Sequence, residues 1–336
     1  MQIGRVVPAI LLVLVACVGA PRDGLAEDPP RVPQDVDLVL VLDSSASMQS
    51  LVDGARDKLA KVITSIATAT PEPNLRLALL TYGSPDDRSL DGHVMLRSDL
   101  TYNFDRVFDQ LDAVRVRGGH EHVGSALFHA LTRLSWTRNS LRIVFVAGNE
   151  SADQDRARPV DRVVERMAKR GVRLNALYCG GPDDGIADSW RELAKLGDGT
   201  FANIDHNHGE VTVASPFDKE LASLSGKLTE SHARAGLPKT TLALMARIDA
   251  RAAALDPAIA AERAILKASP LYRTDDGPAF AATASLRRRI EALAAKRRAH
   301  VADAMRSRAL DDRLAFDRAV RDALRAQLSD AGFKLP

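Results

Sequence analysis

The side chains with the clearest chemical potential follow an apolar run at residues 36–42. Asp43, Ser45 and Ser47 come directly after this run, at every second position. Carboxylate and hydroxyl oxygens are hard ligands of the kind that Mg²⁺ prefers, and a tight loop can present several of them to one ion. A serine in such a place also commonly caps the helix that follows. The pattern therefore favours either a divalent-metal site or an ordinary helix start.

A second polar stretch reads GGHEHVGSAL and holds Glu121 between His120 and His122. A further His-x-His pair is formed by His206 and His208. Imidazole ligands suit Zn, Cu or Ni, and two histidines on one strand face can chelate such an ion. Both pairs are expected on loops, so we favour the interpretation that they are surface histidines without a metal.

No familiar arrangement of catalytic residues is present in the sequence. There is no G-x-S-x-G elbow, no H-E-x-x-H pair and no Walker loop for phosphates. A serine hydrolase built on His120 would still need an orienting carboxylate and an oxyanion hole. We therefore expect a binding protein rather than an enzyme.

Strand and helix patterns alternate along the first two thirds of the chain. Continuous apolar runs typical of buried strands alternate with segments of helical spacing, and this alternation predicts a doubly wound α/β fold. Strands are predicted at residues 36–42, 75–82, 93–97, 141–147, 172–178 and 200–204. Helices are predicted at 51–68, 104–113, 123–134, 158–170 and 187–196. The expected sheet is mostly parallel, with helices on both faces.

The last third of the chain has a different composition. Strand patterns end near residue 214, and amphipathic helical spacing follows, for example at Leu286, Ile290 and Leu293. Residues 227–336 carry 21 Lys and Arg against 13 Asp and Glu, whereas the rest of the chain carries 25 against 31. A basic surface of this kind is compatible with nucleic acid or an anionic membrane, but we favour a solvated helical surface.

The N-terminus has the pattern of an export signal. One arginine precedes an apolar segment at residues 6–16, which is too short to span a bilayer as a mature helix. The following Leu-Val-Ala-Cys resembles a bacterial lipobox, which would make Cys17 the lipidated first residue. Cleavage near Ala26 is the alternative. A Pro-rich linker at residues 27–35 then leads to the first strand.

The D-x-S-x-S pattern at Asp43, Ser45 and Ser47, directly after a buried strand, resembles that of a von Willebrand factor A-type (VWA) domain. The resemblance covers roughly residues 35–225. It implies a metal-ion-dependent adhesion site (MIDAS), in which both serine hydroxyls bind the cation directly and the aspartate acts mostly through water.

The two other loops of such a site depart from the family pattern. The family usually places a threonine in the second loop, and a branch resembling integrin β subunits uses a glutamate five residues before an alanine. Glu121 and Ala126 have this spacing, so the resemblance assigns Glu121 as the third ligand. The third loop often contains Asp-Gly, and here Gly148 stands at the aspartate position. Asn149 or Glu150 is the candidate to reach the site instead.

The resemblance implies a binding module that holds Mg²⁺ or Mn²⁺. An acidic side chain of a protein partner would complete the coordination sphere. We expect an exported cell-envelope protein, lipid-anchored or periplasmic or secreted, with no nucleic-acid partner. A structural scaffold with a degenerate, metal-free site is the main alternative, and a metal-assisted hydrolase is a third. The predicted organisation is an export signal (1–26), a linker (27–35), a VWA domain (36–225) and a helical basic tail (226–336).

Overall fold

The computed structural model of the chain describes most residues from 35 onwards. The described ranges are 35–86, 90–181, 185–204, 213–275, 283–306 and 316–335. The predicted export signal with Cys17, the linker up to residue 34 and the His206/His208 pair lie outside the described residues.

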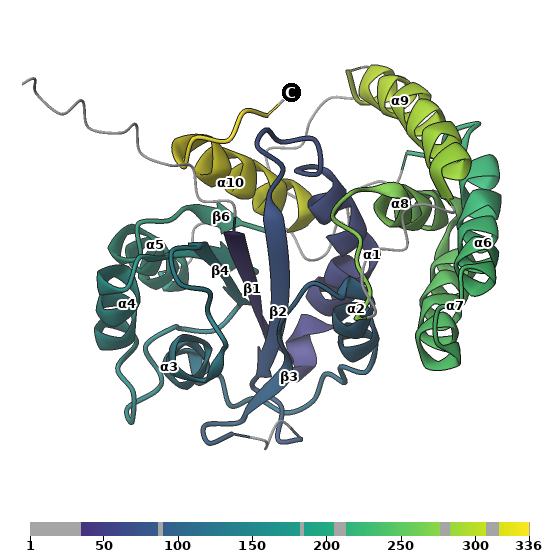
Figure 1. Ribbon diagram of the computed structural model, residues 1–336. Helices are drawn as coiled ribbons and strands as arrows, with labels where there is room; N and C mark the ends of the chain where they lie inside the picture. The colour runs from purple at the N-terminus through teal and green to yellow at the C-terminus, as the bar shows by residue number, and fades with distance from the viewer. Residues whose placement is uncertain are drawn as a thin grey trace, which may run out of the picture. The chain divides into compact units, whose positions relative to one another are not determined.

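A mostly parallel sheet forms the centre of the fold (Figure 1). Its strands are β1 (Asp35–Asp43), β2 (Asn74–Tyr82), β3 (Val94–Thr101), β4 (Leu141–Gly148), β5 (Val172–Tyr178) and β6 (Phe201–Asn203). They lie in the order β3-β2-β1-β4-β5-β6, and every neighbouring pair is parallel except β2 and β3. The expected doubly wound, mostly parallel α/β fold is therefore confirmed.

The central strand β1 explains why its sequence is almost continuously apolar. Successive side chains of a strand point to opposite faces, and both faces of this strand are covered. Leu38, Leu40 and Leu42 belong to the core on one side of the sheet. Val39 and Val41 belong to the core on the other side. All five side chains are fully buried.

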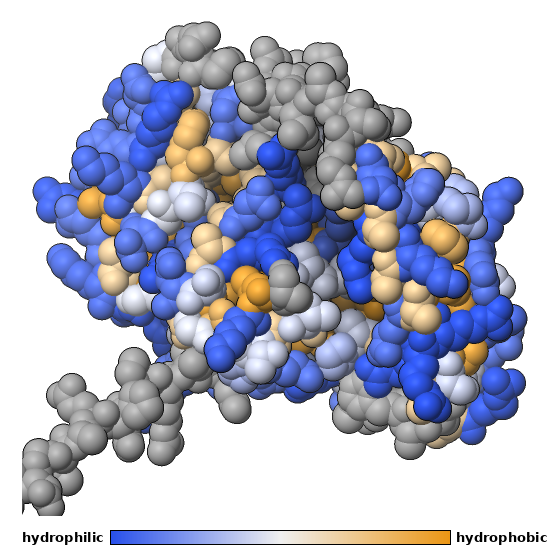
Figure 2. Space-filling view, turned by 90° about the horizontal axis from the view of Figure 1, so that it is seen from above, coloured by the Kyte–Doolittle hydropathy of each residue, from blue (hydrophilic) through white to orange (hydrophobic). Residues whose placement is uncertain are grey.

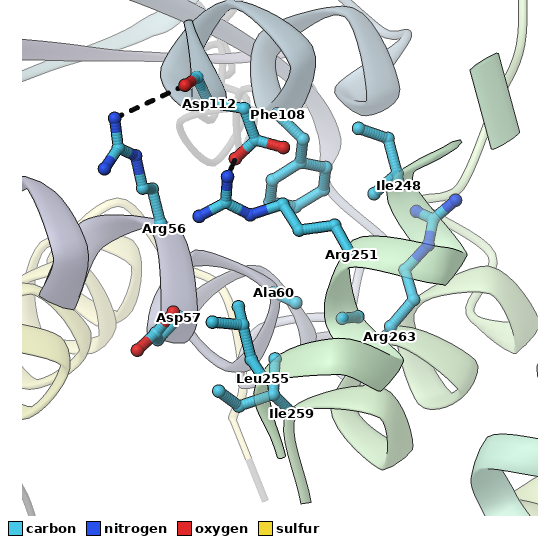
Figure 3. A pocket seen from close by; sticks show the side chains of 11 residues that line it. Arg56, Asp57, Ala60, Phe108, Asp112, Ile248, Arg251, Leu255, Ile259 and Arg263 are labelled. Carbon is cyan, nitrogen blue, oxygen red and sulfur yellow. Dashed lines mark hydrogen bonds and ion pairs between the residues drawn. The ribbon is translucent and has the colours of Figure 1, made fainter. Parts of the chain in front are cut away.

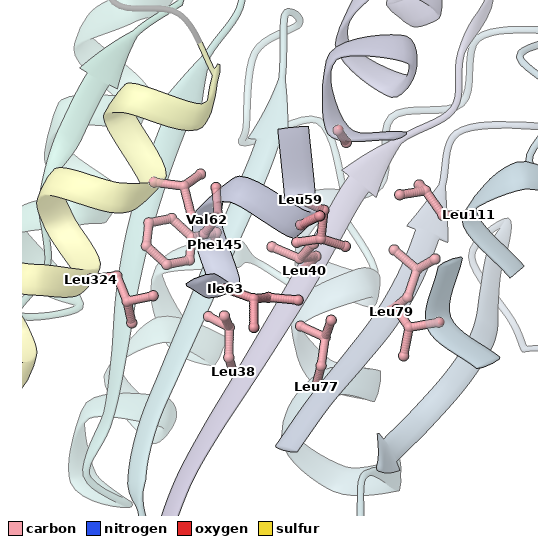
Figure 4. Packing of buried hydrophobic residues seen from close by; sticks show 14 of the residues in the cluster. Leu38, Leu40, Leu59, Val62, Ile63, Leu77, Leu79, Leu111, Phe145 and Leu324 are labelled. Carbon is pink, nitrogen blue, oxygen red and sulfur yellow. The ribbon is translucent and has the colours of Figure 1, made fainter. Parts of the chain in front are cut away.

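Helices cover both faces of the sheet. The 3-10 turn η1 (Ala46–Met48), α1 (Gln49–Thr64), α2 (Phe104–Asp112) and α10 (Phe316–Asp330) contribute to the first core. The second core contains residues of α3 (Val123–Arg133), α4 (Val160–Lys169) and α5 (Ile186–Leu196). Figure 4 shows Val62 of α1 and Leu324 of α10 beside Phe145 of β4. The last helix of the chain thus packs directly against the central sheet.

The remaining helices form a layer outside α1 and α2 (Figure 1). They are α6 (Asp218–Arg234), α7 (Lys239–Leu255), α8 (Pro257–Ala268) and α9 (Ala284–Arg306). Residues of α6, α8 and α9 form a small core of their own, and α7 and α8 place Met245, Ile248 and Leu266 in the core beside the sheet. The described part of residues 226–336 is mostly helical, as expected, and its helices pack onto the sheet domain. None of the described helices is long and apolar enough to cross a membrane.

Candidate metal-binding site

The strand order places Asp43 and Gly148 at the point where ligands bind in open α/β sheets. Asp43 is the last residue of β1, and Gly148 is the last residue of the adjacent parallel strand β4. The chain continues from β1 towards one side of the sheet and from β4 towards the other. A crevice at the carboxyl ends of two such strands is the usual ligand site.

Backbone hydrogen bonds hold the loops around Asp43 together. The Ser44 amide donates to the carbonyl of Tyr82 at the end of β2, at 2.7 Å. The Ala46 amide donates to the Gly118 carbonyl at 3.1 Å, and the Arg117 amide donates to the Ser44 carbonyl at 2.9 Å. The first and second loops are therefore fixed relative to each other without any ligand.

Asp43 is a buried carboxylate with only one of its oxygens satisfied. The side chain is 1% exposed, and its Oδ1 accepts a 2.7 Å hydrogen bond from the Ser45 amide. Its Oδ2 is buried and has no hydrogen-bond partner. Burial raises the pKa of Asp43 to about 7, the hydrogen bonds from Ser45 oppose this rise, and the charges of Glu121 and Glu150 add to it. The site thus calls for a proton or a cation at this carboxylate.

Gly83 is needed beside Asp43 for two reasons. Its φ of +94° lies in the region that favours glycine. A Cβ at this position would also lie 2.7 Å from Asp43 Oδ1. The end of β2 can therefore approach the carboxylate only because residue 83 has no side chain.

The serine hydroxyls gather beside Asp43 and do not cap the helix. Ser45 is buried and Ser47 is exposed, and their Oγ atoms are 3.4 Å apart. Ser45 stands at the N-cap of η1, but it makes no side-chain capping hydrogen bond. The N-cap of α1 is Met48, which has none either. The hydroxyls thus remain available for another role.

Glu121 lies on the second loop, next to the start of α3. Its side chain is 9% exposed. One of its oxygens would be 3.3 Å from a Cβ at Gly119, so the glycine leaves the carboxylate room. The negative charge of Glu121 is close enough to raise the pKa of Asp43. The structure therefore brings both carboxylates into one electrostatic environment.

The third loop has no room for the usual aspartate. A Cβ at Gly148 would lie 2.5 Å from the Tyr82 hydroxyl and 3.0 Å from the Trp190 ring. Tyr82 is fully buried and donates to the Ala147 carbonyl at 2.9 Å. The Trp190 indole N–H donates to the Glu150 carbonyl at 2.8 Å. These two aromatic side chains occupy the space that a longer residue would need.

The next two residues differ in how they face the site. Asn149 donates from Nδ2 to Ser47 Oγ at 3.0 Å, and its Oδ1 is buried without a hydrogen-bond partner. Glu150 is exposed, and its carboxylate accepts a hydrogen bond from Gln154 at 3.3 Å. The sequence did not decide which of the two residues reaches the site. In the structure, Asn149 is the one of the two that contacts a serine. The aromatic filling at Gly148 gave no signal in the sequence.

Three histidine rings gather at the rim, including one that the sequence did not single out. His93 stacks on His120 with ring centroids 4.3 Å apart and planes at 10°, and His122 lies 6.0 Å from His93. Across the described residues, no group of three or more His, Cys, Asp or Glu side chains is arranged to hold a metal ion. His93 and His120 are thus stacked, and His122 is tilted against both of them.

The donor set at Asp43 nevertheless fits a hard divalent cation. It consists of oxygens only. These are the Asp43 carboxylate, which has one buried oxygen without a hydrogen-bond partner, and the two serine hydroxyls, which do not cap a helix. Glu121 adds a second carboxylate nearby. Mg²⁺ is typically held by one or two carboxylates and keeps several waters, so a site with few protein ligands suits it.

A separate shallow pocket lies between the helices (Figure 3). Phe108, Ile248 and Leu255 line it, and Arg251 forms a 2.8 Å ion pair with Asp112 at its edge. None of the residues that line it belongs to the loops around Asp43. The surface seen in Figure 2 is mostly hydrophilic, with separate apolar patches. The residues that line the pocket come from α1, α2, α7 and α8, so it lies where the outer helices meet α1 and α2.

Several solved structures match about half of the chain at low sequence identity. The conserved hypothetical protein BatB from Bacteroides thetaiotaomicron matches 51% of this chain and 90% of its own, with 14% identity and a TM-score of 0.40. The pilus adhesin SpaC from Lactobacillus rhamnosus GG matches 52% of this chain and 28% of its own, with 16% identity and a TM-score of 0.40. Proximal thread matrix protein 1 from the mussel byssus, with a zinc-occupied MIDAS motif, matches 52% and 43%, with 14% identity and a TM-score of 0.38.

The family assignment rests on the sequence of the domain itself. No curated protein matches the chain. Residues 37–208 match the von Willebrand factor type A domain, and this segment is more than half of the 336 residues. The match contains all but the first two residues of β1, the whole of β2 to β6, and the loops that carry Asp43 and Glu121. The chain belongs to the von Willebrand factor type A domain family.

Proposed function

We propose that this VWA domain is a binding module that takes up Mg²⁺ or Mn²⁺ through Asp43, Ser45 and Ser47. Glu121 of the second loop supplies the second carboxylate. A protein partner supplies an acidic side chain to the remaining coordination position. Domains of this family commonly mediate protein–protein interaction or adhesion. In this proposal the site binds its partner and catalyses no reaction.

The observation that carries the proposal is the state of Asp43. A buried carboxylate oxygen without a hydrogen-bond partner is costly unless a proton or a cation satisfies it. Its pKa of about 7 means that the proton is held only loosely at neutral pH. A divalent cation can replace this proton. Two carboxylates, from Asp43 and Glu121, then balance the charge of the ion.

The exposure of Ser47 supports access by a partner. Asp43 and Ser45 are buried, whereas Ser47 is exposed at the same edge of the sheet. A cation on these oxygens would therefore have one side towards solvent. A carboxylate is the side chain best suited to that open position, because it brings both charge and a hard oxygen.

The cellular setting belongs to the same proposal. We expect export and retention in a bacterial cell envelope, with a lipid on Cys17 or cleavage near Ala26. Metabolic labelling with a radioactive fatty acid tests the anchor. Label should enter the natural protein and be absent from Cys17→Ser. Label in both would show that the lipid is elsewhere, and label in neither would favour cleavage near Ala26.

Isothermal titration calorimetry with MgCl₂ and MnCl₂ tests the cation site. The natural chain should show saturable binding, and Asp43→Ala and Glu121→Ala should each lose it. Glu150→Ala is the matched control, because this carboxylate is near but exposed and bound to Gln154. Because Glu150 acts on Asp43 only through its charge, we expect Glu150→Ala to weaken binding less than Glu121→Ala does. Unchanged affinity in Asp43→Ala would refute the proposal.

A scaffold with a metal-free site is the second candidate, favoured by the aromatic filling at Gly148. Partner capture in the presence and absence of EDTA separates the two functions. Capture that survives EDTA supports the scaffold, and capture that is lost supports the cation site. Deletion of residues 227–336 is a poor test, since α8 and α10 belong to the core beside the sheet.

A further inference from the structure

The third loop of this site has Gly148 at the usual aspartate position, and another residue is placed to act in its stead. We propose that Asn149 is a positioning residue of the cation site, which orients the Ser47 hydroxyl and supplies a neutral oxygen to the shell of the bound ion. This inference rests on the proposed cation site. It concerns a residue that the family pattern does not assign.

The first step is the contact between Asn149 and Ser47. Ser47 is the exposed member of the serine pair, and the 3.4 Å separation of its Oγ from Ser45 Oγ is too long to fix the direction of its hydroxyl by itself. Asn149 Nδ2 donates to Ser47 Oγ at 3.0 Å and occupies one of its two lone pairs. The second lone pair then has a fixed direction. Asn149 thereby prepares Ser47 to bind a cation.

The second step is the unsatisfied oxygen of the same amide. Asn149 Oδ1 and Asp43 Oδ2 are both buried and both lack a hydrogen-bond partner. A hydrated cation held at Asp43 would offer both oxygens a partner: the carboxylate would balance the charge, and the amide oxygen could accept a hydrogen bond from a water of the ion. Mg²⁺ retains several waters in protein sites. Asn149 would thus contact the hydration shell of the ion.

The third step is the geometry that excludes the alternatives. Gly148 cannot carry a side chain towards the site, because Tyr82 and Trp190 fill that space. Glu150 is exposed and bound to Gln154. Of residues 148–150, Asn149 alone has a side-chain hydrogen bond to one of the serines. The third loop therefore reaches the site one position later than the family pattern, and with an uncharged group.

Two substitutions at Asn149 test this role in the full-length protein by calorimetry with MgCl₂. Asn149→Leu removes donor and acceptor and should weaken binding about tenfold, the size expected for one lost hydrogen bond. Asn149→Asp keeps the acceptor oxygen, replaces the amide donor by a second oxygen that carries negative charge, and should strengthen binding about tenfold. Asn203→Asp is the matched control, since Asn203 ends β6 and donates to the Gly180 carbonyl at 3.0 Å. We expect no gain there.

The outcomes separate this inference from the proposed function. Natural affinity in Asn149→Leu, with binding still abolished by Asp43→Ala, would overturn the role of Asn149 and leave the cation site intact. No saturable Mg²⁺ binding in the natural chain and in Asn149→Asp would overturn both. Thermal unfolding in EDTA checks that the variants fold, and Asn149→Ser replaces Asn149→Leu if the latter does not. A gain in Asn203→Asp equal to that in Asn149→Asp would also overturn the inference.

Discussion

Residue 148 connects the packing of the domain to the chemistry of its site. Tyr82 reaches it from β2 and Trp190 reaches it from α5, so two separate elements meet at one glycine. A family-like aspartate at this position would need both aromatic side chains to move. In the natural chain, the aromatic packing of Tyr82 and Trp190 occupies this space, and residue 148 is a glycine.

Gly148→Asp should consequently destabilise the protein and should not improve metal binding. Overpacking of a filled core costs about 1–3 kcal/mol, and thermal unfolding followed by circular dichroism measures the loss. Gly226→Asp is the matched control, because a Cβ at Gly226 meets nothing within 4 Å. We expect little change there. Adding Tyr82→Phe to Gly148→Asp removes the 2.5 Å contact and should restore part of the stability. Equal stability of Gly148→Asp and the natural chain would contradict this account.

The sequence predicted those site residues that lie close together along the chain. Asp43, Ser45 and Ser47 follow one strand, so their spacing alone placed them together. Glu121 needed the family resemblance, because it comes from a separate loop. Tyr82 and Trp190 could not be anticipated, since their approach depends on the register of β2 and on the position of α5 across the sheet.

At the scale of single elements, α10 packs against the central sheet although it lies at the far end of the sequence. Its side chains Val320, Leu324 and Leu328 are fully buried in the core beside β1 and β4. Gln327 forms a buried amide pair with Asn175 of β5, with Nε2 donating to Asn175 Oδ1 at 2.7 Å. The helix therefore both covers apolar surface and satisfies a polar group inside the sheet.

Leu324→Ala should lower the free energy of unfolding by about 2–5 kcal/mol, the usual cost of truncating a buried leucine. Urea unfolding followed by circular dichroism measures the change. Ser329→Ala on the same helix is the control, since Ser329 is exposed and should be nearly neutral. Comparable stability of the two variants would mean that α10 does not support the sheet core in solution.

A second element-scale prediction concerns His232 on α6. The side chain is 4% exposed, and burial lowers its pKa to about 4, helped by the positive charges of Lys267 and Arg287. The folded state thus favours neutral histidine. Its stabilising contribution is complete above the ordinary pKa of 6.5 and is lost as the pH falls from 6.5 towards 4.

His232→Gln should remove this part of the acid sensitivity. The difference in unfolding free energy between the natural chain and the variant should shrink by up to ~3 kcal/mol from pH 7 to pH 4, since one pKa unit corresponds to ~1.4 kcal/mol. Urea unfolding at several pH values between 4 and 7 measures it. A difference that stays constant over this range would show that His232 already titrates normally in the folded protein.

Element type was easier to predict than element placement. Spacing of four between Val320, Leu324 and Leu328 identified a helix, because apolar residues at that interval share one face. The same spacing does not say which surface this face will cover. The strand runs were recognised because burial on both faces makes them continuously apolar. The packing of α7, α8 and α10 against the sheet domain depended on contacts far apart in sequence.

At the scale of the whole molecule, one buried ion pair joins the helical layer to the sheet domain. Arg263 of α8 donates to both carboxylate oxygens of Asp105 on α2, at 2.6 and 2.9 Å. Both side chains are almost fully buried, and Tyr272 and Asp249 complete the network around Arg263. Removing one partner of such a pair leaves an uncompensated buried charge and typically costs about 3–5 kcal/mol.

We therefore expect the sheet domain and the outer helices to unfold as one cooperative unit. The two tryptophans, Trp136 and Trp190, both lie in the VWA segment, so their fluorescence reports on that part alone. Far-ultraviolet circular dichroism is dominated by helices and also reports on α6 to α9. In urea, the two signals of the natural chain should share one midpoint.

Arg263→Met should break this coupling. The variant leaves Asp105 buried without its cation, so the helical layer should detach at lower urea than the sheet domain unfolds. The circular dichroism midpoint would then precede the fluorescence midpoint. Arg247→Met is the matched control, because Arg247 pairs with Asp109 of α2 through a side chain that is 62% exposed, and its midpoints should still coincide. Separate midpoints already in the natural chain would mean that the ion pair at Asp105 does not bind the two layers into one folding unit.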